Sequence, residues 1–338
     1  MKSYFQIVLA IIFVIFLSAG NAVAQVASEG NLAYALSNYQ LNKSAVDNGQ
    51  EFLIRNRMDS GATWTVYGDT LILDRIGGKS FALLQRATDG AELFSTQDFL
   101  FQTGVGPRVG VVGEDILFGF DVEASYFGID NWEASKSLTD VDGNGMTYTL
   151  FGVPTAVAPF STIDLHYISR LHNAEINMRF PIWENVRVLG GFRYLQLHEV
   201  LDLTSTDTQW VQSNVDNNLY GGQIGLQAAL INRDRFSIET VLKAGIYGNY
   251  TDSLFDSSST GVLGDKTTHA AFVGEVGLMG IVQVTGCMSV RGGYQVMWLD
   301  GVAIASDQFQ SLNPVNPKPY VGGTLLYHGA YAGVECSF

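Results

Sequence analysis

The stretch that decides the fold is RFSIETVLKAGI, residues 235–246, in which apolar and polar side chains alternate. Phe236 and Ile246 share one parity with the apolar residues between them, whereas Glu239 and Lys243 have the other. Successive side chains of a strand point to opposite faces, so this segment predicts a strand with one apolar and one polar face. Such a strand is typical of a transmembrane β-barrel, with lipid outside and a polar lumen inside.

The same alternation recurs along the chain and defines ten candidate strands. They lie at 62–75, 96–112, 116–129, 162–180, 185–200, 217–231, 235–250, 267–284, 287–300 and 325–338. We therefore expect an all-β fold, a transmembrane antiparallel up-and-down barrel of ten strands, with twelve as the alternative.

The predicted connections alternate in length. The short ones are 113–115, 181–184, 232–234 and 285–286, and the long ones are 76–95, 130–161, 201–216, 251–266 and 301–324. Outer-membrane barrels have short periplasmic turns and long external loops, so the pattern fits that class.

One predicted strand, 162–180, changes its parity. Ile163 and Leu165 are apolar odd positions, whereas Ile176 and Met178 are apolar even positions. A bulge inserts one residue and so switches the faces of a strand. We expect one near residues 170–172.

The N-terminus carries the features of a signal peptide. Lys2 gives a basic start, residues 7–17 are apolar, and Ala22-Val-Ala24 forms an A-x-A cleavage site. We assign residues 1–24 to this peptide, 25–61 to an N-terminal periplasmic extension, and 62–338 to the barrel. No later apolar stretch reaches the roughly 18 residues of a membrane helix, so any span must be a closed barrel.

The chain ends on an alternating strand closed by Phe338. This ending resembles the signal read by the outer-membrane barrel insertion machinery. An even strand count also puts both ends on the periplasmic side. We expect localisation in a Gram-negative-type outer membrane, with its lipid and lipopolysaccharide as further partners.

Composition supports an envelope protein and excludes a nucleic-acid partner. Charged residues make up 15% of the chain, well below the quarter that is usual in soluble domains. The net charge of −14 is opposite to what phosphate binding requires. Cys287 and Cys336 fall at the periplasmic rim of adjacent strands, but their parities point to opposite faces, which argues against a disulfide.

Five ordered phrases carry a family resemblance. They are NAEIN (173–177), GGFRYLQLHE (190–199), NLYGGQIG (218–225), KAGIYGN (243–249) and GYQVMWLDGVA (293–303). From about Ala62 to the end, the chain resembles the putative β-barrel porin-7 family of planctomycete outer-membrane proteins. The resemblance implies a barrel in a bacterial outer membrane and, as an expectation, a transport role.

Charged residues at lumen-facing parity form the candidate site. They are Arg108, Asp121, Glu123, Glu175, Arg179, Arg187, Arg193, Glu239, Lys243, Glu275, Arg291 and Glu335. Six acids and six bases in a narrow ten-stranded lumen favour mutual ion pairing, for example of Arg193 with Glu175. The other reading is a narrow channel whose charges tune selectivity.

Three functions therefore compete: a porin for passive passage of small solutes, a structural or adhesive surface barrel with a lumen plugged by paired charges, and a rim-located hydrolase. The hydrolase is the weakest, because His166, His172, His198, His269 and His328 are scattered over four strands without a local motif. We expect no enzyme activity and no cofactor.

A weak calcium motif lies in a predicted external loop. Asp140, Asp142 and Asn144 occupy positions 1, 3 and 5 of a calcium loop, with Gly145 at position 6. Phe151 replaces the glutamate that the twelfth position requires. The same residues also form ordinary turns, and no other metal site is expected.

Overall fold

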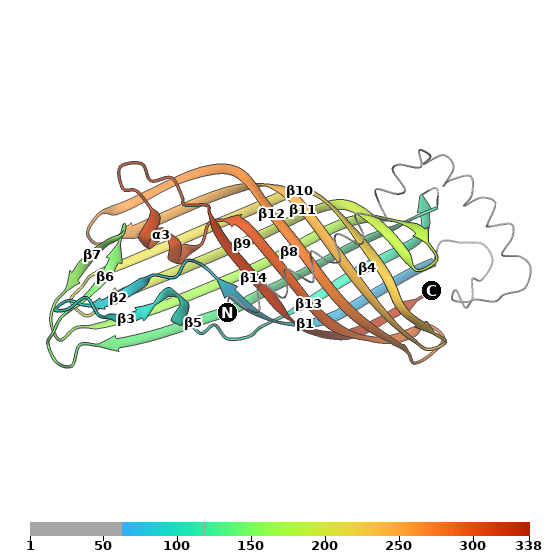
Figure 1. Cartoon of the computed structure of the whole chain (residues 1–338), viewed down its shortest axis with the longest axis horizontal. Coiled ribbons are helices and arrows are strands. Elements are labelled where there is room, and N and C mark those ends of the chain that lie inside the picture. Colours follow the sequence, from blue (N-terminus) through green and yellow to red (C-terminus); the bar gives the residue numbers. More distant parts are fainter. Residues whose placement is uncertain (1–62, 118) are drawn as a thin grey trace, which may run out of the picture. The chain divides into compact units, whose positions relative to one another are not determined.

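The computed structural model describes residues 63–117 and 119–338, and in this part ten long strands form a closed antiparallel barrel (Figure 1). The barrel strands are β1 (Thr63–Gly77), β4 (Gly104–Leu117), β5 (Phe120–Thr139), β8 (Thr162–Trp183), β9 (Val186–Ser205), β10 (Trp210–Arg233), β11 (Phe236–Ser257), β12 (Gly261–Gln283), β13 (Met288–Val302) and β14 (Gly323–Ser337). The predicted ten-stranded barrel is confirmed. The signal peptide and the extension at 25–61 fall outside the described residues.

The last strand closes the barrel against the first. β14 pairs with β1 in a regular register that includes Leu71 opposite Tyr331. Phe338, just past β14, exchanges two backbone hydrogen bonds of 2.9 Å with Trp64. The sheet therefore has no free edge at this seam, which is what a lipid environment requires of a barrel.

Two of the predicted long loops do not exist. β9 runs to Ser205 and β10 begins at Trp210, so most of 201–216 is strand; likewise only residues 258–260 separate β11 from β12. These strands continue well past the apolar segments that identified them.

Three long connections fold together at one end of the barrel, and we call their residues, 78–103, 140–161 and 303–322, the plug. They contain four short strands and two short helices. These are β2 (Ala82–Arg86), β3 (Glu92–Ser95), β6 (Met146–Leu150), β7 (Val153–Val157), the 3₁₀-helix η1 (Thr96–Asp98) and α3 (Ala305–Ser311). The strands form a separate sheet in the order β3-β2-β6-β7. Among the described residues, no helix is long and apolar enough to cross a membrane.

The polarity of the barrel wall inverts between its two halves. Near the short turns, outward positions are apolar and inward positions are polar or charged; we call this the belt half. Near the plug the arrangement is reversed, and we call this the tower half. On β10, Tyr220, Ile224 and Leu230 are exposed in the belt half, whereas the outward positions of the tower half are Asn214 and Asp216.

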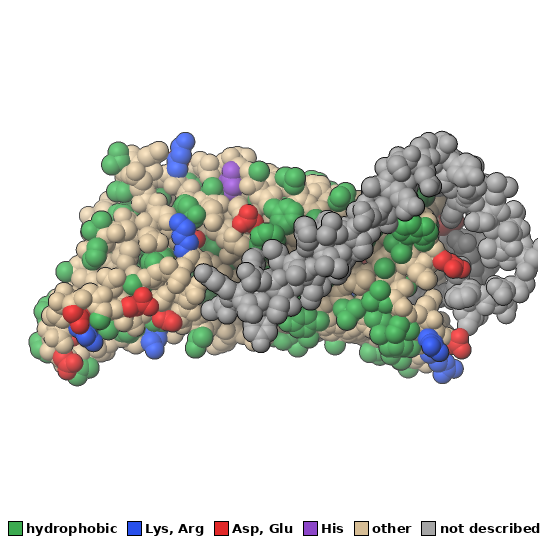
Figure 2. All heavy atoms as spheres, in the orientation of Figure 1, with side chains coloured by type: hydrophobic (Ala, Val, Ile, Leu, Met, Phe, Trp, Pro, Cys, Tyr) green, Lys and Arg blue, Asp and Glu red, His purple; other side chains and the backbone are tan. Residues whose placement is uncertain are grey.

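Figure 2 shows the larger clusters of hydrophobic side chains on the half of the barrel nearer the short turns. Charged side chains on the same face are scattered over the half nearer the plug, and a few more lie at the tip near the short turns. An apolar band bounded by polar surface is the lipid-facing signature of an outer-membrane barrel.

This inversion, and no bulge, explains the parity change in β8. The pairing of β8 with β9 runs without a register shift from Ile163 to Pro181, so the bulge expected near residues 170–172 is not on β8. A register shift does occur there in the pairing with β5, where the extra residue lies on β5 between Ile129 and Trp132. Ile163 is 0% exposed inside the tower half, whereas Ile176 is 52% exposed on the outside of the belt half. The strand keeps the same residues facing inward and outward along its length. Only the environment changes, from an apolar exterior in the belt half to an apolar interior in the tower half.

Candidate functional site

The belt half of the lumen is crossed by a network of paired charges. Arg193 on β9 lies directly opposite Glu175 on β8. Its Nη2 lies 3.1 Å from Glu175 Oε2 and 2.5 Å from Glu275 Oε2, and the side chain is 1% exposed. Lys243 Nζ approaches the other Glu175 oxygen at 2.8 Å. Two cations and two carboxylates from four strands therefore neutralise one another across the lumen.

A second cluster is centred on Asp69, whose side chain is fully buried. Its Oδ2 lies 2.6 Å from Arg108 Nη2 and its Oδ1 lies 3.2 Å from Arg291 Nε. Both guanidinium groups also lie over aromatic rings: Arg108 is 4.0 Å from the centroid of Tyr331, and Arg291 is 4.1 Å from that of Tyr67. Cation–π contacts of this kind add to the ion pairs and fix the planes of the guanidinium groups.

Ion pairing loosens toward the short turns. Arg179 lies 3.9 Å from Glu123, and Arg187 lies 3.7 Å from Asp121. The exposed fraction of the arginine side chain rises in the same direction, from 1% at Arg193 to 10% at Arg179 and 42% at Arg187. The lumen is therefore more accessible to solvent at the short-turn end.

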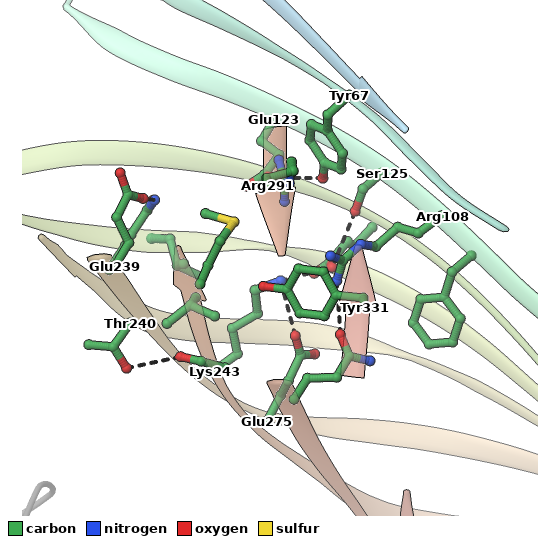
Figure 3. A pocket seen from close by; sticks show the side chains of 18 of the residues that line it. Tyr67, Arg108, Glu123, Ser125, Glu239, Thr240, Lys243, Glu275, Arg291 and Tyr331 are labelled. Carbon is green, nitrogen blue, oxygen red and sulfur yellow. Dashed lines mark hydrogen bonds and ion pairs between the residues drawn. The ribbon is translucent and has the colours of Figure 1, made fainter. Parts of the chain in front are cut away.

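The structure places all twelve predicted lumen charges on the inner face of the barrel. Among those not yet located, Glu335 lies 3.4 Å from Arg291, and Glu239 accepts a hydrogen bond of 2.8 Å from Gln227. Figure 3 shows side chains of Arg108, Glu123, Glu239, Lys243, Glu275 and Arg291 converging from several strands on a pocket in the lumen. The empty space of this pocket is about 680 Å³ when the solvent at its open mouth is included. Asp69 was not among the lumen charges predicted from the sequence. Its odd position, shared with Tyr67 and Leu71, could have placed it on the inner face.

Above the charges, an apolar layer fills the barrel. Its residues come from all sides of the wall and include Leu71, Leu195, Leu219, Val273 and Met297, which are at most 1% exposed. Trp132 lies in the same layer and donates a hydrogen bond of 2.9 Å from Nε1 to the Leu73 carbonyl. A layer packed in this way leaves no room for a hydrated ion.

The plug forms a third layer and gives the tower half a core like that of a soluble protein. Plug residues such as Leu84, Tyr148 and Phe309 pack against inward side chains of the barrel such as Leu203 and Phe255. Phe309 and Phe255 meet edge to face with 5.3 Å between ring centroids. The plug end of the barrel is therefore filled by packed side chains.

Glu199 on β9 ties the plug to the barrel wall. It forms a fully buried ion pair with Arg75 on β1 and accepts hydrogen bonds from Tyr167 Oη at 2.7 Å and Ser169 Oγ at 3.0 Å. The backbone N–H of Ala305, at the start of α3, donates a hydrogen bond of 3.1 Å to the same Glu199 carboxylate. This carboxylate thus has four partners, one of which belongs to the plug.

A buried asparagine makes a second attachment. Asn217 on β10 donates from Nδ2 to the Ala303 carbonyl at 2.8 Å and accepts from the Ala303 N–H at 2.8 Å. The Asn217 amide thereby satisfies both backbone groups of Ala303, in the segment that leads into α3. Sequence reasoning missed both Arg75 and Asn217, because their partners lie far away in the chain.

The possible calcium loop is organised by backbone donors. Asp140 accepts hydrogen bonds from the N–H groups of Asn144, Gly145 and Phe160 at 2.9 to 3.1 Å. The Phe160 N–H is the main cause that holds the pKa of the Asp140 carboxyl below its usual range. Asp142 and Asn144 are exposed. The geometry is that of a turn capped by an aspartate.

The histidines do not gather at one rim. His166, His172 and His198 face outward from the tower half and pair with Glu133, Asp130 and Asp216. His328 also faces outward, against Tyr294, while His269 bonds the Gly301 carbonyl from inside. Within the described ranges, no group of three or more His, Cys, Asp or Glu side chains is arranged to hold a metal ion.

Comparison with known families supplies the identity of the chain. The model of the family described as "Putative beta barrel porin-7" matches residues 140–324, which is more than half of the sequence. The chain belongs to this porin-7 family. It is an outer-membrane β-barrel protein, and no curated protein matches it.

Solved structures similar to this porin-7 family member are distant outer-membrane barrels. The outer membrane protease OmpT of Escherichia coli aligns with a TM-score of 0.47 and 9% identity, over 83% of this chain and 99% of its own. A major outer membrane protein of Thermus thermophilus gives 0.33 and 12%, over 82% and 100%. The toluene transporter TodX of Pseudomonas putida gives 0.31 and 11%, over 83% and 90%. Similarity this low carries no argument about activity.

Proposed function

We propose that this porin-7 family member is a sealed outer-membrane barrel that does not conduct ions or small solutes in its resting form. Its working surface is then the rigid tower that stands above the lipid. The observation that carries the proposal is the buried, largely apolar layer between the charged lumen and the plug, in which Trp132 and five other apolar residues are at most 1% exposed.

The layers act in series, and each one opposes conduction for a different reason. The charge network holds Arg193 and Lys243 against their carboxylates, so few free charges line the path. The apolar layer excludes water, and a dry apolar constriction is a barrier to ions. The plug is fastened by Glu199 and Asn217, so it is part of the fold and is not a mobile loop over an open pore.

The orientation follows from the connections. Short turns face the periplasm in outer-membrane barrels, so the tower and the plug face outward. The lumen is then a blind vestibule that opens to the periplasm. A surface protein of this form offers adhesion or anchoring without making the membrane permeable.

Single-channel recording tests this proposal. The mature chain is refolded, inserted into a planar bilayer and checked for insertion by its heat-modifiable mobility. We expect a silent bilayer at moderate voltage, with a known open porin recorded in the same bilayers as a positive control. Reproducible conductance steps in the wild type would contradict the sealed barrel.

The second candidate is a gated porin for small solutes, which the family description and the periplasmic vestibule favour. Passage would then require the plug to leave the barrel and the apolar layer next to it, which includes Ile304 of the plug, to open. Glu199→Ala removes the carboxylate that holds Ala305 and leaves Arg75 buried without its partner. Conductance in this variant but not in the wild type, and none in the outward-facing control His198→Ala, would favour gating.

A further inference from the structure

The two cysteines lie side by side at the short-turn end of the barrel. Cys336 is near the end of β14 and pairs in register with Met288, the first residue of β13. Cys287 immediately precedes Met288, and its carbonyl accepts a hydrogen bond of 2.8 Å from the Ser337 N–H. The backbone thus places Cys287 and Cys336 at diagonal positions of two paired strands.

Both are free thiols in this structure, and their side chains are close enough to interact electrostatically. The expectation that they point to opposite faces is wrong, because Cys287 belongs to the turn before β13. Strand alternation does not apply in that turn, where Thr285 Oγ1 lies 3.8 Å from Cys287 Sγ and accepts a hydrogen bond of 3.0 Å from the Met288 N–H. The backbone hydrogen bond between Ser337 and Cys287 holds this turn beside β14.

We propose that Cys287 and Cys336 form a disulfide in the mature protein. Each thiol loses a proton and together they give up two electrons as the S–S bond forms. The oxidant is a second protein that carries a reactive disulfide. This disulfide accepts the two electrons and two protons and becomes a dithiol. Both surfaces of an outer membrane lie outside the cytoplasm, where such oxidants act and disulfides persist. Cys287 is exposed, so the oxidant can reach it.

The bond would close a covalent loop around the segment that carries α3. About 50 residues separate the two cysteines, and they include β13, the third plug segment and β14. Cross-linking restricts the unfolded chain more as the enclosed loop grows. The disulfide therefore fastens the base of the β13–β14 unit at one end of the barrel, while Glu199 and Asn217 fasten its plug segment at the other.

Peptide mass analysis of the full chain from isolated outer membranes tests the proposal. Free thiols are trapped with acid and iodoacetamide before any reductant is added. We expect a peptide pair linked through Cys287 and Cys336, lighter by two hydrogens, with both residues alkylated only after reduction. Full alkylation of both cysteines without reductant, or a disulfide that joins two chains, would overturn it.

Matched variants separate the bond from a general effect on folding. In Cys287→Ser, the remaining Cys336 should alkylate without reductant, which shows that the reagent reaches this rim. Reductant should lower the unfolding temperature of the wild type by several degrees and leave that of Cys287→Ser unchanged. An equal response of both proteins to reductant would also count against the disulfide.

Discussion

The belt half and the tower half of this barrel are made by the same strands, yet they follow opposite rules. In the belt half, β8 presents Ile176 and Met178 to the outside and keeps Glu175 inside. In the tower half, the same strand buries Ile163 and Leu165. A β-strand has no fixed apolar side of its own. The solvent on each side of the wall decides which parity is apolar.

The two halves also seal the barrel by different means. In the belt half, charges from facing strands neutralise one another, and the resulting network is only as stable as its pairing. In the tower half, apolar side chains pack around the plug, as they do in a soluble core. Substitutions in the two halves should therefore differ in their cost to stability.

Arg193→Ala should cause the largest loss of stability. The variant leaves Glu175 and Glu275 buried with only Lys243 to neutralise them. Breaking a buried ion pair by removing one partner costs about 3–5 kcal/mol. Urea titration of the protein in lipid vesicles measures the change. As a control, Arg170→Ala on the outer face of β8 should cost little, and equal losses in the two variants would contradict a buried network.

Two isoleucines on β8 compare the halves directly. Ile163→Ala empties space in the tower core and should cost about 2–5 kcal/mol, as large-to-small core substitutions do. Ile176→Ala faces lipid, where the surrounding chains fill the space, so we expect a clearly smaller loss. Unfolding of both variants under the same conditions gives the ratio of their losses in unfolding free energy. A larger loss for Ile176→Ala would refute the assignment of the halves.

Lysine substitutions on one face of β10 test where the membrane ends. Ile224→Lys places a charge in the lipid and should cost about 2–4 kcal/mol if it lies near the bilayer midplane. Asn214→Lys has the same parity but lies in water, so its cost should be close to zero. The free energy of unfolding in vesicles distinguishes them. Similar costs at the two positions would move the membrane boundary toward the plug.

The smallest effect concerns pH. Burial, aided by the nearby Glu199, raises the pKa of the Asp307 carboxyl in the plug, against the opposing N–H of Lys79 and the charges of Lys79 and Arg75. The folded plug therefore favours protonated Asp307. The contribution of protonated Asp307 to the stability of the plug is fully present below the ordinary aspartate pKa, and it is lost as pH rises through the raised pKa.

Hydrogen exchange of residues 303–322 measures this dependence. Protection should decrease modestly as pH rises through the interval just above the ordinary aspartate range, once intrinsic exchange rates are corrected. Asp307→Asn should flatten the profile. Asp140 behaves in the opposite way. Backbone N–H donors lower the pKa of its carboxyl, so its contribution to the stability of the fold is lost only as pH falls below the ordinary aspartate range. A profile that Asp307→Asn leaves intact would exclude Asp307 as its source.

Local patterns in the sequence were enough for the belt half and failed in the tower half. Alternation in residues 235–246 is visible without knowing any contact, and all ten strands were found in this way. The tower strands around 201–216 alternate less clearly, because Val211 and Val215 face a core supplied by distant loops. The lumen parity of Arg193 could be predicted. The plug attachment of Glu199 to Ala305, 106 residues apart, could not, because no local signal links them.

We infer that the barrel leaves the membrane partway along its strands, and lipid quenching of β10 tests this most directly. Single cysteines at Gln212 and Ile224, in a chain with Cys287→Ser and Cys336→Ser, are labelled with a fluorophore and reconstituted with brominated lipids. We predict strong quenching at position 224 and almost none at position 212. Equal quenching at both positions would contradict the tower and place the whole barrel in the bilayer.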